Sequence, residues 1–183
     1  MNEKIKEQVT FQNLHYTRSF RETFISSLSA PITSVVICSP FFDRLPNPFK
    51  DVLGFCFFLK RRGTERIQII TRPPGSNPQA MSLEVAKALA AEDVEIYIRS
   101  SPYLHAKVYH IEYARGYFRT FVGSANFTIG GLERNHEVVA EMFGTGIASP
   151  CHREIERMQS TFGALTFAAW IAQGQPLTMG EDI

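Results

Sequence analysis

A short window of this chain gathers side chains that could carry out phosphoryl chemistry. His105 and Lys107 stand two residues apart, as do Ser124 and Asn126, and Glu137 follows soon after. Because side chains alternate across an extended strand, each pair can share one face. A nucleophile, a cation, a hydroxyl, an amide and a carboxylate are the groups needed to attack a phosphodiester and stabilise its charge. This set of groups needs no metal ion, and we expect neither a metal nor another cofactor.

The spacing of these residues resembles the active-site motif of the phospholipase D superfamily. That motif is His-x-Lys, a gap of four residues, Asp, and then Gly-Ser-x-Asn; here it is residues 105–107 (His-Ala-Lys) and 123–126 (Gly-Ser-Ala-Asn). His-x-Lys alone would carry no weight. The five fixed residues together are expected by chance in roughly one chain of this length per thousand or more. The resemblance therefore predicts a phospholipase D-like phosphodiesterase.

The resemblance implies a role for each residue of the window. His105 would attack phosphorus and form a covalent phosphohistidine that water later hydrolyses. Lys107 and Asn126 would bind the non-bridging oxygens, and Ser124 would donate a hydroxyl or orient a neighbour. Glu137 resembles the family carboxylate that hydrogen-bonds the far nitrogen of the histidine and fixes its tautomer. For Glu137, the competing interpretation is a salt-bridged strand residue.

One position departs from the family motif, because Glu112 stands where the family usually has Asp. On a regular strand, His105, Lys107 and Tyr109 face one side, whereas His110 and Glu112 face the other. Glu112 should therefore be structural rather than catalytic.

Two further residues are candidate substrate contacts. Arg72 lies just past a predicted strand, where ligand-binding loops gather, although an ordinary surface arginine is the competing interpretation. Asn135 places an amide close to Glu137. The remaining histidines have no partner at a useful spacing, so solvated or core positions are expected for them: His15, His110, His136 and His152.

Composition and pattern predict one α/β domain. The chain has 183 residues, of which 44% are hydrophobic and 12% aromatic, enough for a single core. Short β-rich runs alternate with helical stretches, which favours a mixed, mostly parallel β-sheet flanked by helices on both faces. This is the phospholipase D-like α-β-α sandwich that the motif implies. We expect the domain to cover residues 1–175, with a C-terminal tail at 176–183.

Three predicted elements matter for the window. Residues 34–38 should form a buried strand, and 104–111 should form the strand that carries His-x-Lys. A helix after residue 47 should be capped by Asn47, with Pro48 in its first turn.

Charge and cysteine usage narrow the function classes. Nineteen Lys and Arg against 18 Asp and Glu give a formal charge of +1, so no global field attracts nucleic acid and any basic surface must be local. The N-terminal residues lack an apolar secretory core, and no stretch approaches the ~20 apolar residues of a membrane span. A cytoplasmic location without membrane association is expected. Three widely spaced cysteines indicate neither a disulfide framework nor a zinc site.

The motif occurs once in the chain, and this bears on assembly. In the superfamily a second histidine protonates the leaving oxygen, so the resemblance implies a homodimer with two His105 side chains across a shared site. Single-motif bacterial endonucleases and the nuclease domains of metal-independent restriction enzymes are similar in this respect. The leading hypothesis is therefore a metal-independent DNA endonuclease. A separate specificity or defence-system subunit would have to supply any sequence specificity.

Two alternatives stay open. A phospholipase-type or small-diester phosphodiesterase would use the same groups, although lipid enzymes of the superfamily usually carry two motifs in a much longer chain. A catalytically inactive dimerising or binding module of a larger nuclease system would keep the fold without the reaction.

Overall fold

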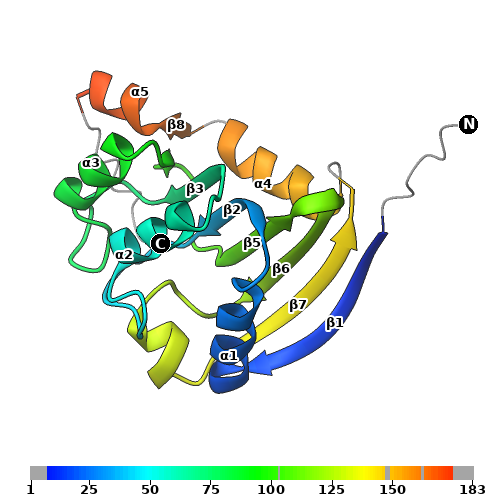
Figure 1. The fold of residues 1–183 in the computed structure, drawn as a ribbon. Helices are drawn as coiled ribbons and strands as arrows, with labels where there is room; N and C mark the ends of the chain where they lie inside the picture. The colour runs from blue at the N-terminus through cyan, green and yellow to red at the C-terminus, as the bar shows by residue number, and fades with distance from the viewer. Residues whose placement is uncertain (1–7, 103, 147–148, 162, 175–183) are drawn as a thin grey trace, which may run out of the picture.

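A computed structural model describes residues 8–102, 104–146, 149–161 and 163–174 (Figure 1). The strands are β1 Gln8–Tyr16, β2 Ile32–Cys38, β3 Arg66–Thr71, β4 Glu95–Arg99, β5 Val108–Tyr113, β6 Tyr117–Gly123, β7 Val138–Thr145 and β8 Ala164–Thr166. The helices are α1 Thr17–Ser27, α2 Val52–Arg61, α3 Leu83–Ala91, α4 Pro150–Ser160 and α5 Phe167–Ala172, with short turns η1 Ala114–Gly116 and η2 Gly130–Arg134. No helix in this part of the chain is both long and apolar enough to cross a membrane. The expected tail at 176–183 lies outside the described residues.

The eight strands form one sheet in the order β1-β7-β6-β5-β2-β3-β4-β8. The prediction of a mixed α/β sheet with helices on both faces is confirmed, but the sheet is not mostly parallel. Only two of its seven neighbouring pairs, β2/β3 and β3/β4, are parallel. These are the pairs joined through the crossover helices α2 and α3, which parallel pairing requires. The three-residue turn η1 between β5 and β6 can join only antiparallel strands.

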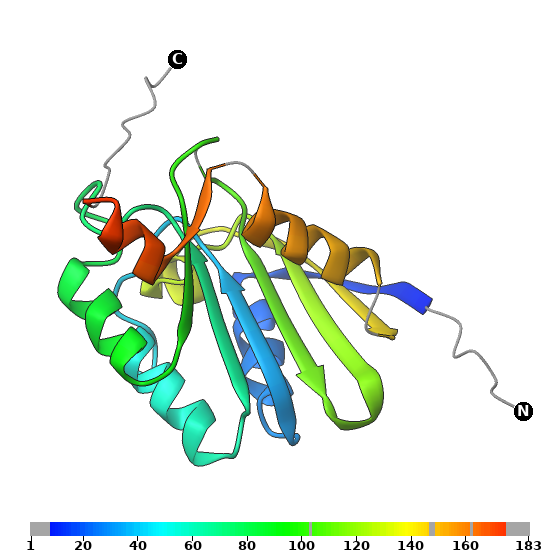
Figure 2. The same cartoon turned by 90° about the horizontal axis from the view of Figure 1, so that it is seen from above.

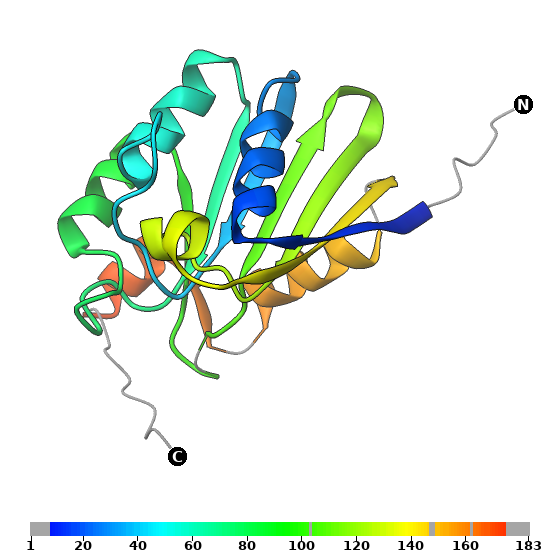
Figure 3. The same cartoon turned by 90° about the horizontal axis from the view of Figure 1, so that it is seen from below.

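The two faces of the sheet are covered by different helices. Helices α1, α2, α3 and α5 pack on one face over the larger core, whose aromatic centre includes Phe24, Tyr109, Phe121 and Phe127. Helix α4 covers part of the opposite face, where a smaller cluster contains Val36, Cys38, Ile70, Leu104 and Ile155. Views from opposite sides show α1 and α4 on opposite faces (Figures 2 and 3).

The predicted boundaries near the site need two corrections. Helix α2 begins at Val52 rather than after residue 47, because Asp51, not Asn47, is its N-cap and accepts a hydrogen bond from the Gly54 amide at 2.8 Å. The predicted strand at 104–111 begins only at Val108, so His105 and Lys107 lie in the irregular segment that leads into β5. The predicted strand at 34–38 is confirmed within β2.

Strand β1 was not predicted, and it completes the sheet beside the site. It pairs with β7 in antiparallel register, with Tyr16 opposite Val138. The chain then turns directly into α1 at Thr17. The first residue of α1 is thereby placed next to the start of β7, where Glu137 lies.

Candidate active site

His105 and Lys107 lie in a short segment whose backbone carbonyl oxygens accept hydrogen bonds from buried side chains. Leu104 is buried in the smaller core, and its carbonyl oxygen accepts a hydrogen bond from Arg72 Nε at 2.7 Å. The His105 side chain is exposed, whereas only 6% of Lys107 is exposed. Lys107 Nζ donates to the His105 carbonyl oxygen at 2.8 Å and lies 3.0 Å from His105 Nδ1. The two predicted residues are therefore in contact, with the imidazole open to solvent.

Neighbouring cations favour the neutral form of the histidine. Lys107 first, and then burial and Arg72, lower the pKa of His105. Burial and Arg72 also lower the pKa of Lys107, while Glu137 acts in the opposite direction. A neutral imidazole keeps the lone pair that a nucleophile needs.

Arg72 is not an ordinary surface arginine. Only 6% of it is exposed, and its guanidinium carbon lies 4.8 Å from the centre of the Phe41 ring. Arg72 directly follows β3, and the end of this strand places the cation beside the site, where it lowers the pKa of both His105 and Lys107.

The Gly-Ser-Ala-Asn segment at 123–126 is attached to the first motif segment by hydrogen bonds. The Gly123 amide donates to the Lys107 carbonyl oxygen at 3.3 Å. The fully buried Tyr109 donates its hydroxyl to the Ala125 carbonyl oxygen at 2.7 Å. At the far end of the segment, the Phe127 amide donates to Ser39 Oγ at 3.0 Å. The two halves of the motif thus form one structural unit.

Glu137 is buried and holds the rest of the window together. Its carboxylate accepts hydrogen bonds from Ser124 Oγ and, at 3.1 Å, from Asn135 Nδ2. Its amide donates to Thr17 Oγ1 at 2.9 Å, and Thr17 in turn donates to the Asn135 carbonyl oxygen. Among the described residues no hydrogen bond joins Glu137 to His105. The tautomer-fixing role of Glu137 therefore stays a prediction.

A groove of about 480 Å³ opens beside this unit. Its lining includes Phe41, Asp43, Gln79, Asn126, Arg134 and Asn135. The side-chain oxygen of Asn126 is buried and has no hydrogen-bond partner in the described part of the chain. An unsatisfied buried carboxamide is typical of a site that receives a polar ligand. Asn126 and Asn135 both line the groove, and their roles as substrate contacts stay predictions.

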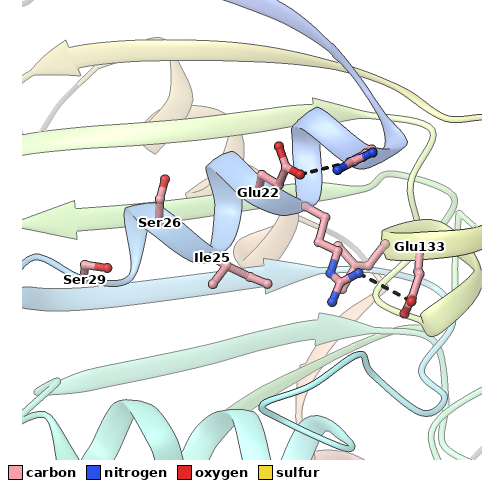
Figure 4. Close-up of a pocket in the computed structure, with 8 residues that line it drawn as sticks. Glu22, Ile25, Ser26, Ser29 and Glu133 are labelled. Carbon is pink, nitrogen blue, oxygen red and sulfur yellow. Dashed lines mark hydrogen bonds and ion pairs between the residues drawn. The ribbon is translucent and has the colours of Figure 1, made fainter.

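A larger hollow of about 660 Å³ lies elsewhere, between α1 and η2 (Figure 4). Its charged side chains are already paired: Arg18 with Glu22 at 3.1 Å, and Arg21 with Glu133 at 3.4 Å. The motif residues do not line it. The pair between Arg21 and Glu133 holds η2, which lies between Asn126 and Glu137 in the chain, against α1.

Glu112 lies on the face of the sheet opposite Tyr109, as strand alternation predicted. It accepts hydrogen bonds from His110 Nε2 at 3.3 Å and from His152 Nε2 at 2.8 Å, and these bonds lower its pKa to about 2. The family departure therefore falls outside the candidate site. The expected core or solvated positions of the remaining histidines are confirmed, since His15 and His110 are buried and His136 is exposed. The buried ones are nevertheless paired, because His15 also bonds Glu141, at 2.7 Å.

Comparison with known proteins agrees with this geometry. The model of the phospholipase D-like domain of cardiolipin synthase matches residues 24–159. The chain belongs to the phospholipase D superfamily. The family match and the assembled motif make it a phospholipase D-like phosphodiester hydrolase. A search of curated protein sequences finds no match.

Several solved structures share the fold. Nuc, a phospholipase D family member from Salmonella typhimurium, is 21% identical, with 87% of this chain and 99% of Nuc covered and a TM-score of 0.59. NucT from Helicobacter pylori is 18% identical, with 87% and 100% covered and a TM-score of 0.52. Phosphatidylserine synthase from Haemophilus influenzae is 11% identical, with 90% of this chain but 41% of that chain covered and a TM-score of 0.55.

Several residues that position the site of this hydrolase were missed from the sequence. Thr17, Ser39 and Gly131 come from three different elements or loops, and their roles depend on contacts across the fold. Tyr109 was placed on the site face by alternation, but its bond to Ala125 was not foreseen. Gly131 has the clearest requirement, since a Cβ there would lie 2.2 Å from the Asn126 carbonyl oxygen and 2.6 Å from its amide nitrogen.

We expect Gly131→Ala to destabilise this phospholipase D-like domain by about 1–3 kcal/mol, because the added methyl group collides with the Asn126 backbone. Gly130→Ala is the matched control, since its Cβ would meet only side chains, those of Asn135 at 3.2 Å and Thr128 at 3.5 Å. Urea denaturation of the two variants measures the difference. Equal free energies of unfolding would contradict the proposed packing.

The His105 imidazole should titrate below the ordinary histidine value of about 6.5, because Lys107 disfavours its protonated form. Replacing the cation in Lys107→Met should raise this pKa, whereas Lys87→Met, at an exposed position on α3, should leave it unchanged. Titration of the His105 ring signals by NMR measures both effects. An unchanged His105 pKa in Lys107→Met would exclude the electrostatic coupling.

Proposed function

We propose that this chain is a metal-independent DNA endonuclease that works as a homodimer. The observation that carries the proposal is the contact between exposed His105 and buried Lys107, beside a groove lined by Asn126. A nucleophile and a fixed cation are in contact, and the amide group of Asn126 belongs to the segment whose Gly123 amide is hydrogen-bonded to Lys107. Together they meet the requirements of phosphodiester cleavage without a metal ion.

The reaction proceeds in two displacements. A neutral ring nitrogen of His105 attacks phosphorus, the bond from phosphorus to the leaving oxygen breaks, and a protonated second histidine gives its proton to that oxygen. Water then attacks the phosphohistidine, losing a proton to the second histidine, and the bond between phosphorus and His105 breaks. Lys107 and Asn126 stabilise the non-bridging oxygens in both steps. The second histidine is His105 of another copy, since the chain holds the motif once.

An exposed apolar stripe beside the site supports the second copy. The stripe consists of Phe11, Leu14 and Tyr16 on β1, Val122 on β6 and Val138 on β7, which are between 39% and 67% exposed. Leu14 and Val122 both lie opposite Ala140, and Tyr16 lies opposite Val138, so these side chains share one face. A continuous apolar surface of this kind marks an interaction site.

The position of the stripe suits a dimer that shares its active site. It lies on the face that α4 covers elsewhere, because the alternate β6 residues Phe118 and Thr120 contact His152 and His110. Val138 directly follows Glu137, and Val122 directly precedes residues 123–126. Burying the stripe between two copies would therefore bring two sites close together.

Chain size favours a nucleic acid over a lipid as substrate. The alignment covers nearly all of Nuc and NucT, but less than half of the phosphatidylserine synthase. Arg134 and Arg72 supply the local positive charge that phosphate contacts need. The lipid phosphodiesterase alternative is favoured by the cardiolipin synthase description of the matching family model. A separate subunit would supply any sequence specificity.

The purified protein should nick plasmid DNA in excess EDTA, and His105→Ala should lower the rate by about 10³-fold or more because it removes the nucleophile. His136→Ala removes an exposed histidine and is the matched control, with an unchanged rate expected. Nicked circles are counted on agarose gels. Absence of cleavage of DNA and RNA by a verified dimer would overturn the nuclease proposal. Release of headgroups from lipid vesicles would then favour the phospholipase-type alternative. Inactivity in both assays would favour the catalytically inactive binding module.

Leu14→Asp combined with Val122→Asp should convert the dimer to a monomer and abolish nicking, because two charges would be buried at the interface. Phe57→Asp is the control, since Phe57 is 41% exposed on α2, away from the stripe. Sedimentation velocity measures the oligomeric state, and circular dichroism confirms folding. A fully active monomer would rule out the shared site.

A further inference from the structure

A second cluster of chemically active side chains lies on the opposite face of the sheet. Nε2 of His110 lies 3.3 Å from Glu112 Oε1, and Nε2 of His152 lies 2.8 Å from the same oxygen. One ligand atom from each of the three residues falls within 4.8 Å of the other two. His110 and Glu112 come from β5, and His152 comes from α4. The cluster thus joins a helix to the strand beneath it.

Both imidazoles are oriented by hydroxyl groups at their other nitrogen. His110 Nδ1 lies 2.7 Å from Thr120 Oγ1, and His152 Nδ1 lies 2.6 Å from Ser149 Oγ. In the metal-free chain each Nε2 donates its proton to Glu112, and each hydroxyl donates to Nδ1. With the proton on Nδ1 instead, each ring would donate to its hydroxyl and direct the Nε2 lone pair toward a metal ion bound beside Glu112. Metal-binding histidines commonly have this arrangement, in which a second group holds the far nitrogen and fixes the tautomer.

An aromatic ring packs against the two imidazoles, and a groove connects the cluster to the solvent. The Phe118 ring centre lies 5.2 Å from that of His110 and 5.1 Å from that of His152, and His110 is fully buried. Glu112, His152 and Phe118 also line a groove of about 210 Å³. A small ion can enter from this groove, and water can occupy a remaining coordination position.

We propose that His110, Glu112 and His152 form a binding site for a divalent transition metal, with Zn²⁺ as the preferred ion. Two imidazole nitrogens and one carboxylate oxygen suit Zn²⁺, whereas Mg²⁺ and Ca²⁺ prefer oxygen ligands alone. Tetrahedral Zn²⁺ places neighbouring ligand atoms about 3.3 Å apart, given bond lengths near 2.0–2.1 Å. The two distances to Glu112, 2.8 and 3.3 Å, are close to this value, and the two histidine ligand atoms, which lie within 4.8 Å of each other, would adjust on binding.

The ion would brace the face behind the active site rather than take part in the reaction. It would tie α4 to β5, and α4 contributes Ile155 to the cluster that also buries Leu104. Because Leu104 precedes His105, the ion would support the backbone next to the active site. It would not reach the site itself, since the Glu112 side chain lies on the face of the strand opposite Tyr109. The bound metal would therefore stabilise the fold without contacting the phosphodiester.

The test uses the full chain after treatment with EDTA and dialysis. Calorimetric titration with ZnCl₂ should give one ion per chain, and Co²⁺ should produce the visible absorption of a tetrahedral nitrogen and oxygen site. In His152→Asn and in Glu112→Gln the affinity should fall at least about tenfold. His136→Asn, a change at an exposed histidine, should bind like the unmodified chain.

Two outcomes would overturn the site: no stoichiometric binding by the folded chain, or equal affinity in His152→Asn. Zn²⁺ should also raise the melting temperature of the unmodified chain and not that of folded His152→Asn. An octahedral Co²⁺ spectrum of the unmodified chain would exclude the proposed ligand set even if both variants fail to fold. The nicking assay runs in EDTA, so its result is independent of this site.

Discussion

A buried positive charge must be compensated, and this requirement organises the active site. The ammonium group of Lys107 is almost fully buried, and Arg72, another buried cation, lies close enough to lower its pKa. One buried carboxylate, Glu137, offsets them in part. Among the described residues, Glu137 is thus the carboxylate that acts on Lys107, the cation in contact with the proposed nucleophile His105. A phosphodiester bound at Lys107 would bring a second negative charge to this buried cation.

Strand β5 makes separate contacts on each face of the sheet. Tyr109 faces the larger core and supports residues 123–126, whereas His110 and Glu112 face α4. Because alternate residues point in opposite directions, changes in the second set leave the first in place. This separation explains how Glu112 can replace the usual Asp of the superfamily motif. The longer side chain serves two histidines on the far face and has no contact with His105.

Short sequence patterns predicted local features of the fold and the site, but they could not predict contacts between residues far apart in the chain. Alternation along β5 correctly separated Tyr109 from Glu112, and the motif spacing predicted that His105 and Lys107 would come together. The helix cap was misplaced at Asn47, because Asp51 three residues before Gly54 fits the rule equally well and only the fold selects between them. The missed partners depend on pairs far apart in the chain. His152 meets Glu112 across 40 residues, a separation that no short pattern encodes.

The pairing of β1 with β7 has a consequence for how the protein is made. His15 and Glu141, which bond each other across this pair, are 126 residues apart, and Thr17 and Glu137 are 120 apart. Closing so large a loop is slow and must wait until β7 has left the ribosome. A nascent chain therefore carries His105, Lys107 and Asn126 before the Glu137 carboxylate is fixed in place. For a proposed nuclease, this order of folding delays competence until nearly the whole domain has been synthesised.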